Sequence, residues 1–127
     1  MKINNNKIQF KDYFYAEDEL LEMALKHHKA GDLQTAESIY RKIYINNPRN
    51  ADALHLSALI LYHFGMLSTA ISTIKRAISL KSDSPQYYYN LGIFYLEAND
   101  NKQTKECFRK ALELKPEYVK AKKAING

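Results

Sequence analysis

The chain has 127 residues, enough for one domain with a buried core, and its 46% hydrophobic and 26% charged residues are ordinary for a globular protein. No apolar run approaches the roughly 18 residues of a membrane span, and the first residues lack the apolar segment of a secretory signal. The one cysteine, Cys107, excludes an internal disulfide. It fits a reducing compartment and predicts a cytoplasmic protein.

The net charge of +5 is concentrated near the C-terminus. Residues 102–127 carry eight Lys or Arg against three Asp or Glu, which equals the whole excess. A basic segment of this kind can attract nucleic acid or an anionic surface. Solvated faces of ordinary helices have the same composition, and this second interpretation is the one we prefer.

The N-terminal segment, residues 1–16, is rich in aromatic side chains, with Ile8, Phe10 and three aromatic residues at 13–15. So many apolar side chains are not expected to remain in water. The segment can continue the first helix backward as a cap, fold into a groove of its own chain, or enter the groove of a neighbouring chain. No stretch alternates with a period of two over a useful length, so we expect no strands.

From residue 17 onward the sequence repeats with a period of 34 residues. Gly31, Gly65 and Asn99 recur between helical patterns, and these residue types adopt most readily the left-handed conformation that ends a helix. Within each unit the apolar residues recur with a period of 3.6, which is typical of helices. We therefore expect helices at 17–30, 33–46, 51–64, 67–80, 85–98 and 101–114, and a short seventh helix at 117–125.

Two further sets of residues recur at the same spacing. The first set is small: Ala24, Ala58 and Gly92 are expected where two helices cross closely. Large residues are expected to fill the space beside those crossings, and they are Tyr40, Ile74 and Phe108.

The third unit shows the most complete pattern, through Leu91-Gly92, Tyr95, Phe108, Ala111 and Pro116. A 34-residue helix–turn–helix unit with these residues resembles the tetratricopeptide repeat. The resemblance covers residues 17–118 and implies an all-α fold, a right-handed α-solenoid of three repeats with an N-terminal extension and a short C-terminal helix. The implied division is an N-terminal extension or cap (1–16), repeats at 17–50, 51–84 and 85–118, and a capping helix or truncated fourth repeat at 119–127.

The first units also look like the N-terminal repeat regions of multidomain bacterial proteins of this family. In such proteins similar repeats precede glycosyl-, methyl- or sulfotransferase domains. We expect no catalytic domain within these 127 residues, which leaves open whether the chain is a small protein or a piece of a longer one.

Stacked helix pairs form a superhelix whose first helices line a concave groove. An apolar centre flanked by tyrosines suits an amphipathic helix or an extended peptide of a partner protein. The N-terminal segment of the same chain is an alternative cover for part of this groove. From the helix phase, the residues expected to line the groove are Leu25, His28, His55, Leu56, Leu59, Tyr62, His63, Tyr89, Asn90 and Ile93.

Two groove chemistries of the family can be compared residue by residue. Domains that grip the C-terminal carboxylate of chaperones use basic and asparagine side chains, whereas the matching positions here are Leu21, Leu25, Leu56, Gln86 and Asn90. The asparagine ladder of O-linked N-acetylglucosamine transferases would fall on Glu22, Leu56 and Asn90. Only Asn90 is retained in either set, so we expect neither chemistry.

Catalytic, cofactor and metal sites are not expected. His27 and His28 are adjacent on one helix, so their rings point about 100° apart, and no carboxylate or thiolate pair with ligand spacing accompanies them. We expect His27 to be a partly buried histidine with a hydrogen-bond partner. Cys107 has no histidine on its helix face, and the four glycines are too scattered for a phosphate-binding loop.

The sequence therefore predicts a non-catalytic protein-interaction module. Three alternatives stay open at this point. The chain can be the partner- or substrate-recruiting domain of a larger transferase, it can bind nucleic acid or an anionic surface through its basic C-terminal helices, or it can form a homodimer through the N-terminal segment or the repeat ends.

Overall fold

The structure is a computed structural model, and it describes residues 6–126. None of the helices in this part of the chain is long and apolar enough to cross a membrane. In chain order the described elements are β1 (Lys7–Phe10), β2 (Tyr13–Ala16), α1 (Glu17–Lys29), α2 (Leu33–Asn46), α3 (Ala51–His63), α4 (Leu67–Leu80), α5 (Pro85–Glu97), α6 (Asn101–Leu114) and α7 (Val119–Asn126).

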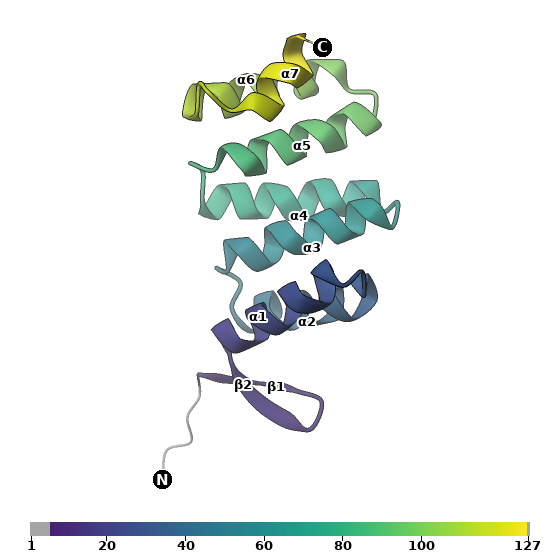
Figure 1. The fold of residues 1–127 in the computed structure, drawn as a ribbon, viewed down its shortest axis with the longest axis vertical. Helices are drawn as coiled ribbons and strands as arrows, with labels where there is room; N and C mark the ends of the chain where they lie inside the picture. The colour runs from purple at the N-terminus through teal and green to yellow at the C-terminus, as the bar shows by residue number, and fades with distance from the viewer. Residues whose placement is uncertain (1–5, 127) are drawn as a thin grey trace.

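Within residues 6–126, six of the helices form three pairs, α1 with α2, α3 with α4, and α5 with α6, and the pairs stack along the long axis of the molecule (Figure 1). This is the α-solenoid that the 34-residue period predicts. The six helices begin and end within one residue of the predicted positions, whereas α7 begins two residues later than predicted.

Each pair is joined by a turn with one left-handed residue, as the sequence predicts. The backbone angle φ is 84° at Gly31, 79° at Gly65 and 61° at Asn99. After the first turn, Asp32 begins the next helix by accepting a hydrogen bond from the backbone N–H of Thr35. Asp100 caps α6 in the same way, whereas the N-cap of α4, Met66, makes no side-chain hydrogen bond.

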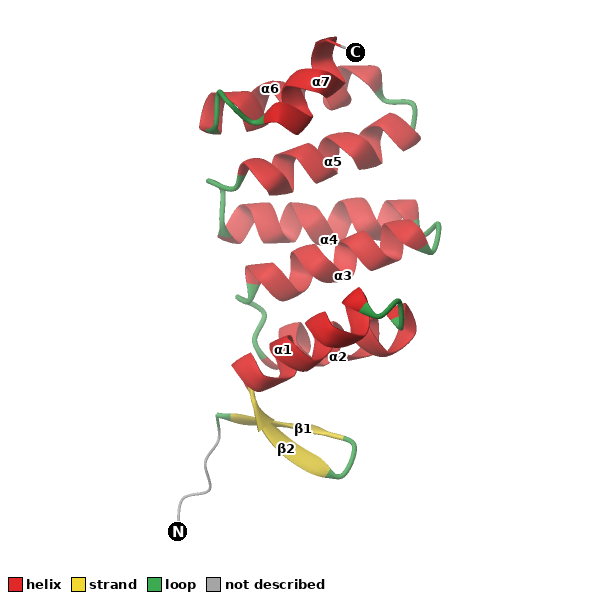
Figure 2. Cartoon of the chain, viewed as in Figure 1, coloured by secondary structure: helices red, strands yellow, loops and turns green. Residues whose placement is uncertain are grey.

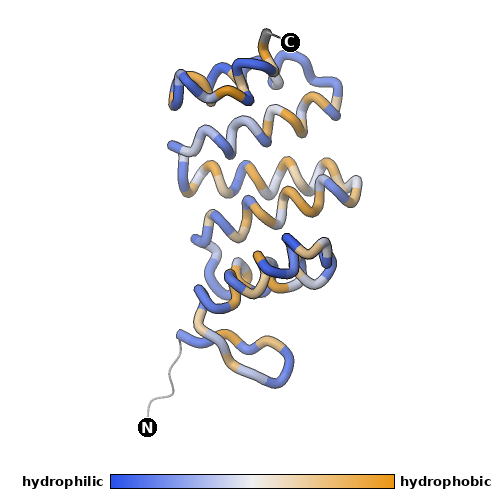
Figure 3. The backbone as a smooth tube through the Cα atoms, viewed as in Figure 1, coloured by the Kyte–Doolittle hydropathy of each residue, from blue (hydrophilic) through white to orange (hydrophobic). Residues whose placement is uncertain are grey.

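The small residues lie where helices cross. Ala24 and Ala58 are fully buried. A Cβ added at Gly92 would lie 2.5 Å from Cε1 of Phe108, so only glycine allows α5 to approach α6 this closely. Tyr40 lies in the core that α1 and α2 share. Figure 3 shows hydrophobic positions recurring along the helices, as expected when every pair buries one face against the next.

The expectation that the chain contains no strands is wrong. β1 and β2 form an antiparallel hairpin in which Ile8 pairs with Tyr15, and the connecting residues are Lys11 and Asp12 (Figure 2). Each strand has only four residues, and the consecutive aromatic residues of β2 hide the alternation of inward and outward side chains. Period analysis has too few positions in such short strands.

The hairpin packs against the end of the stack formed by α1 and α2 (Figure 1). Ile8 is buried in the core of that first pair together with Leu20 and Ile43. The predicted backward continuation of the first helix is therefore wrong. The helix begins at Glu17 because the Glu19 carboxylate accepts a hydrogen bond from the backbone N–H of Ala16, at 2.8 Å. The hairpin covers the end of the solenoid instead of filling its groove.

Candidate functional site

The first helices α3 and α5 lie side by side and are joined by hydrogen bonds between residues 35 positions apart. The Tyr87 hydroxyl donates to a carboxylate oxygen of Asp52, at 2.5 Å. The Asn90 side-chain amide donates to Nε2 of His55, at 2.8 Å. A spacing of 35 is one repeat plus one residue, so these contacts fix the register of one first helix against the next.

His55, a predicted groove residue, is almost completely buried, with 4% of its surface exposed. Its ring stacks on Tyr87 with the centroids 4.4 Å apart. Burial lowers the pKa of His55 to about 4, while the Asp52 carboxylate opposes this shift and Lys81 adds to it. A neutral, buried histidine cannot present its ring to a partner, so His55 is a structural residue beneath the candidate face.

Tyr62 lies in the last turn of α3. Its ring stacks on the buried Phe94 of α5, with the centroids 4.8 Å apart and the planes 19° apart. Its hydroxyl donates to Glu97 at 3.5 Å, and burial together with the Glu97 charge raises the pKa of Tyr62. The side chain is half-buried, so one part of it stays accessible while the stacking contact holds the ring in place.

Tyr89 is held in a similar way on α5. Its ring stacks on the buried Phe108 of α6 at 5.6 Å and meets the edge of Tyr118 at 5.8 Å. Tyr89 and Asn90 are both half-buried. Tyr62 and Tyr89 thus present two tyrosines from neighbouring first helices, each supported by a buried aromatic ring.

The apolar residues predicted for the groove are also half-buried. Leu59 packs against the core between the second and third pairs, and Leu56 packs against the core of the first pair. Leu25 and Ile93 are half-buried on α1 and α5. We call the candidate surface the first-helix face, and its residues are Leu25, His28, Leu56, Leu59, Tyr62, His63, Tyr89, Asn90 and Ile93.

The remaining histidines do not form a cluster. His28 is half-buried and shares a hydrogen bond with the Tyr40 hydroxyl at 2.9 Å, and burial lowers the pKa of His28. His63 is exposed. The predicted partner of His27 is present, because Nδ1 of His27 lies 3.1 Å from a carboxylate oxygen of Asp32. Among residues 6–126, no three His, Cys, Asp or Glu side chains are placed to hold a metal ion.

The one cysteine is a buried packing residue. Cys107 lies in the core between the second and third pairs, and burial raises the pKa of its thiol to about 11. The thiolate is therefore scarce near neutral pH, and thiolate is the nucleophilic form. Every buried side-chain N or O atom in the described part of the chain has a hydrogen-bond partner.

The structure also contains a buried carboxylate that sequence reasoning did not single out. Glu37 on α2 accepts a hydrogen bond from the Ser57 hydroxyl of α3 at 3.0 Å and binds Arg41 at 2.7 Å. This contact links the first pair to the second. The equivalent positions in the next units are Ile71 and Lys105, so the repeat pattern gives no signal for a buried acid here.

Stacked helix pairs with short glycine or asparagine turns define the class of the chain as an α-helical repeat protein. Residues 85–118 match the family profile described as Tetratricopeptide repeat. Residues 85–118 are a tetratricopeptide repeat by this match, and the stacked pairs have the fold of tetratricopeptide-repeat proteins, as the residue pattern predicts. No curated protein matches the chain.

Solved structures have the same fold. MamA matches 86% of this chain with a TM-score of 0.82 and 22% identity. A mutant O-GlcNAc transferase of Thermobaculum terrenum matches 86% with a TM-score of 0.81 and 28% identity. The first TPR domain of Spaghetti (RPAP3), bound to an HSP90 peptide, matches 87% with a TM-score of 0.83 and 21% identity. The chain covers 64% of MamA, 21% of the transferase and 87% of the Spaghetti domain.

Proposed function

We propose that the chain is a non-catalytic interaction module that binds a peptide or helix of a partner protein along the first-helix face. In this proposal the face is the concave groove of the three repeats 17–50, 51–84 and 85–118. The cytoplasmic location inferred from the single cysteine stays a prediction.

The observation that carries the proposal is the support of Tyr62 and Tyr89 by buried aromatic rings. Each tyrosine is half-buried and stacked, Tyr62 on Phe94 and Tyr89 on Phe108. Tyrosines at binding sites contribute large contact areas, and a side chain that is already held in place loses little conformational freedom when a partner binds. Two such residues on adjacent helices are suited to anchor one segment of a partner.

The chemistry around the two tyrosines indicates the type of segment. Leu59 and Ile93 are half-buried apolar residues of the same face, and Asn90 is a half-buried amide beside them. An amphipathic segment can place apolar side chains against the leucine and isoleucine and polar atoms against the amide. The Spaghetti domain is a fold relative with a bound peptide. Its low identity carries over the fold alone, and we propose a different, more apolar ligand for this chain.

The proposal can be tested by capturing the partner from the source cell with purified protein and two variants. Leu59→Glu places a charge in the apolar part of the face, and Tyr62→Ala removes one anchor. We expect both variants to lose the captured partner. Circular dichroism at 222 nm should show that each variant keeps its helices.

The chain offers matched controls for both changes. Ile45→Glu introduces the same charge on the second helix of the first pair, where the side chain is 68% exposed, and Tyr13→Ala removes an equally exposed tyrosine of the hairpin. Both controls should capture the partner as the wild type does. Equal capture by all four variants would place the binding site elsewhere.

A second candidate function is recruitment of substrates or partners to a transferase. The observation that favours it is the 28% identity with the O-GlcNAc transferase, of which the chain covers 21%. Of the transferase asparagine ladder only Asn90 is retained, which argues against the same substrate contacts. A transferase domain encoded in frame after residue 127 would support this candidate, and an unrelated sequence there would contradict it.

A further inference from the structure

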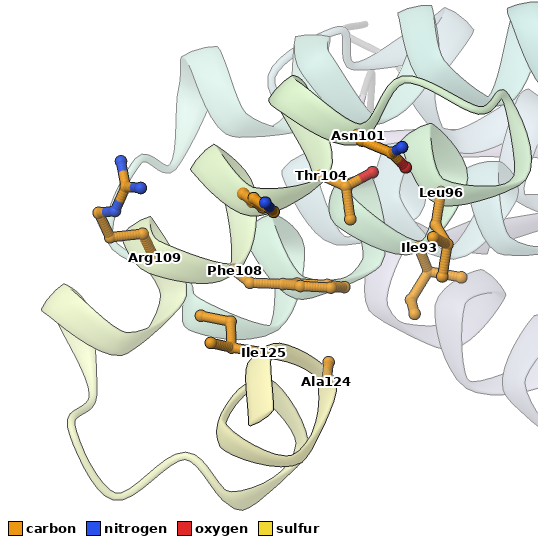
Figure 4. Close-up of a pocket in the computed structure, with 9 residues that line it drawn as sticks. Ile93, Leu96, Asn101, Thr104, Phe108, Arg109, Ala124 and Ile125 are labelled. Atoms are coloured by element: carbon orange, nitrogen blue, oxygen red, sulfur yellow. The ribbon is translucent and has the colours of Figure 1, made fainter. Parts of the chain in front are cut away.

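A cavity of about 440 Å³ lies between α5, α6 and α7, at the end of the stack opposite the hairpin. Figure 4 shows the Phe108 ring next to Ile125 on one side and Ile93 with Leu96 on the other. The polar residues of its lining are Asn101, Thr104, Lys105 and Arg109. Its volume is within the range of pockets that hold small ligands or a few side chains.

The two ends of the solenoid differ. At the N-terminal end the hairpin covers the first pair, and its Ile8 is buried there. At the C-terminal end Leu96 is 50% exposed and Ile125 is 45% exposed, and both line the cavity. Exposed apolar side chains beside a hollow of this size form a surface that a partner can cover.

The charged residues that line the cavity are both positive. Lys105 and Arg109 belong to its lining, and residues 102–127 carry the whole net charge of +5. The Arg109 guanidinium forms a 2.8 Å salt bridge with Glu106. Both side chains are exposed, so Arg109 can exchange Glu106 for a carboxylate of a partner at little cost. A partner with acidic side chains is therefore favoured over a neutral or basic one.

We infer that this cavity is a docking site for an acidic amphipathic helix of a partner protein. Apolar side chains of the helix pack against the Phe108 ring between Ile125 and Ile93, and its carboxylates face Lys105 and Arg109. A helix supplies such a row of apolar side chains at positions three and four apart, next to its charged face. The site shares Ile93 with the first-helix face, but its other lining residues lie outside that face, so it goes beyond the function proposed above.

Two other occupants fit the surface less well. A second copy of the chain placed end to end would bring the same basic residues together, and like charges across an interface are unfavourable. Single-stranded RNA would find the positive charge but would meet the aliphatic side chains of Leu96 and Ile125, whereas sequence-tolerant RNA sites offer accessible aromatic rings for base stacking. The acidic helix uses both the apolar lining and the charge.

The test uses a fluorescein-labelled synthetic peptide of about 18 residues, about five helical turns, with leucines along one face and glutamates elsewhere. A matched peptide has lysines in place of the glutamates. Fluorescence anisotropy should show the acidic peptide binding at least about tenfold more tightly than the basic one, and more weakly as salt is added. Equal binding of both peptides, or of neither, would overturn the inference.

Variants then locate the bound peptide. Ile125→Glu and Lys105→Glu change exposed side chains at the cavity and should each weaken binding by about tenfold. The matched controls Ile45→Glu and Lys42→Glu lie on α2 and should leave the affinity unchanged. An unchanged affinity in Ile125→Glu and Lys105→Glu would place the peptide elsewhere and overturn the inference.

Three outcomes assign the surface to another ligand and overturn the inference. The first is loss of peptide binding in Leu59→Glu but not in Ile125→Glu, which places the peptide on the first-helix face and leaves the proposed function standing. The second is displacement of the peptide by single-stranded RNA, combined with an affinity of the RNA for the protein that Ile125→Glu does not change. The third is a dimer of the free protein in sedimentation that Ile125→Glu dissociates.

Discussion

Replacing His55 tests the polar contacts that join α3 to α5. In the folded protein burial lowers the pKa of His55 from the usual 6.5 to about 4. Between these two pH values the unfolded chain binds more protons than the folded one, so stability falls as the pH is lowered from about 6.5 to about 4. His55→Gln removes this titration and keeps an amide next to Asn90.

The size of the effect follows from the two pKa values. With these two pKa values, protonation of His55 lowers the free energy of unfolding by about 2 kcal/mol when the pH falls from 7 to 4.5. We expect wild type to lose about 2 kcal/mol more than His55→Gln over this range. Ionisable groups that do not interact with His55 contribute equally to both proteins, so their contribution cancels in the difference.

The assay is urea unfolding followed by circular dichroism at several pH values between 7 and 4.5. His63→Gln serves as the matched control because it makes the same substitution at an exposed histidine of the same helix. If wild type and His55→Gln lost the same stability within about 0.5 kcal/mol, His55 would not be buried and neutral, and the described α3–α5 contact would be wrong.

Two further substitutions test the packing between helices, and both are measured by urea unfolding at pH 7. Gly92→Ala places a Cβ 2.5 Å from Phe108 and should destabilise the protein by about 1–2 kcal/mol, in spite of the better helix propensity of alanine; an equal or higher stability would contradict the close crossing. Ser57→Ala removes a hydrogen bond to the buried Glu37 and should cost about 1–2 kcal/mol. The control Ser79→Ala changes an exposed serine and should cost less than about 0.5 kcal/mol, and equal losses in both variants would contradict the buried contact.

The sequence predicts the fold well because its determinants are local and repeated three times. Gly31, Gly65 and Asn99 each need a left-handed conformation, and each has one. Gly92 is small because Phe108 lies against it. A residue that recurs at every 34th position has the same environment each time, so its structural role can be recognised without coordinates.

Features that occur only once were predicted less well. The hairpin was missed because Lys7–Phe10 and Tyr13–Ala16 are too short for a period to emerge. The burial of Glu37 depends on Ser57, whose equivalent positions in the other units are Met23 and Leu91. The division of the chain into its repeats and the residues that contact a partner stay proposals.

Helix phase assigned His55 to the groove because phase gives the direction of a side chain. It does not give the neighbour that covers that side chain. Here Tyr87 and Asn90 of the next first helix lie against the ring and bury it. The contacts between residues 35 positions apart decide which groove residues remain accessible.

The affinity of the captured partner for wild type, Leu59→Glu and Ile45→Glu, measured by isothermal titration calorimetry, tests the central claim most directly. If the first-helix face binds the partner, Leu59→Glu should weaken binding by at least about tenfold, and Ile45→Glu should bind as wild type does. Equal affinities for all three proteins would contradict the claim that this face is the binding surface.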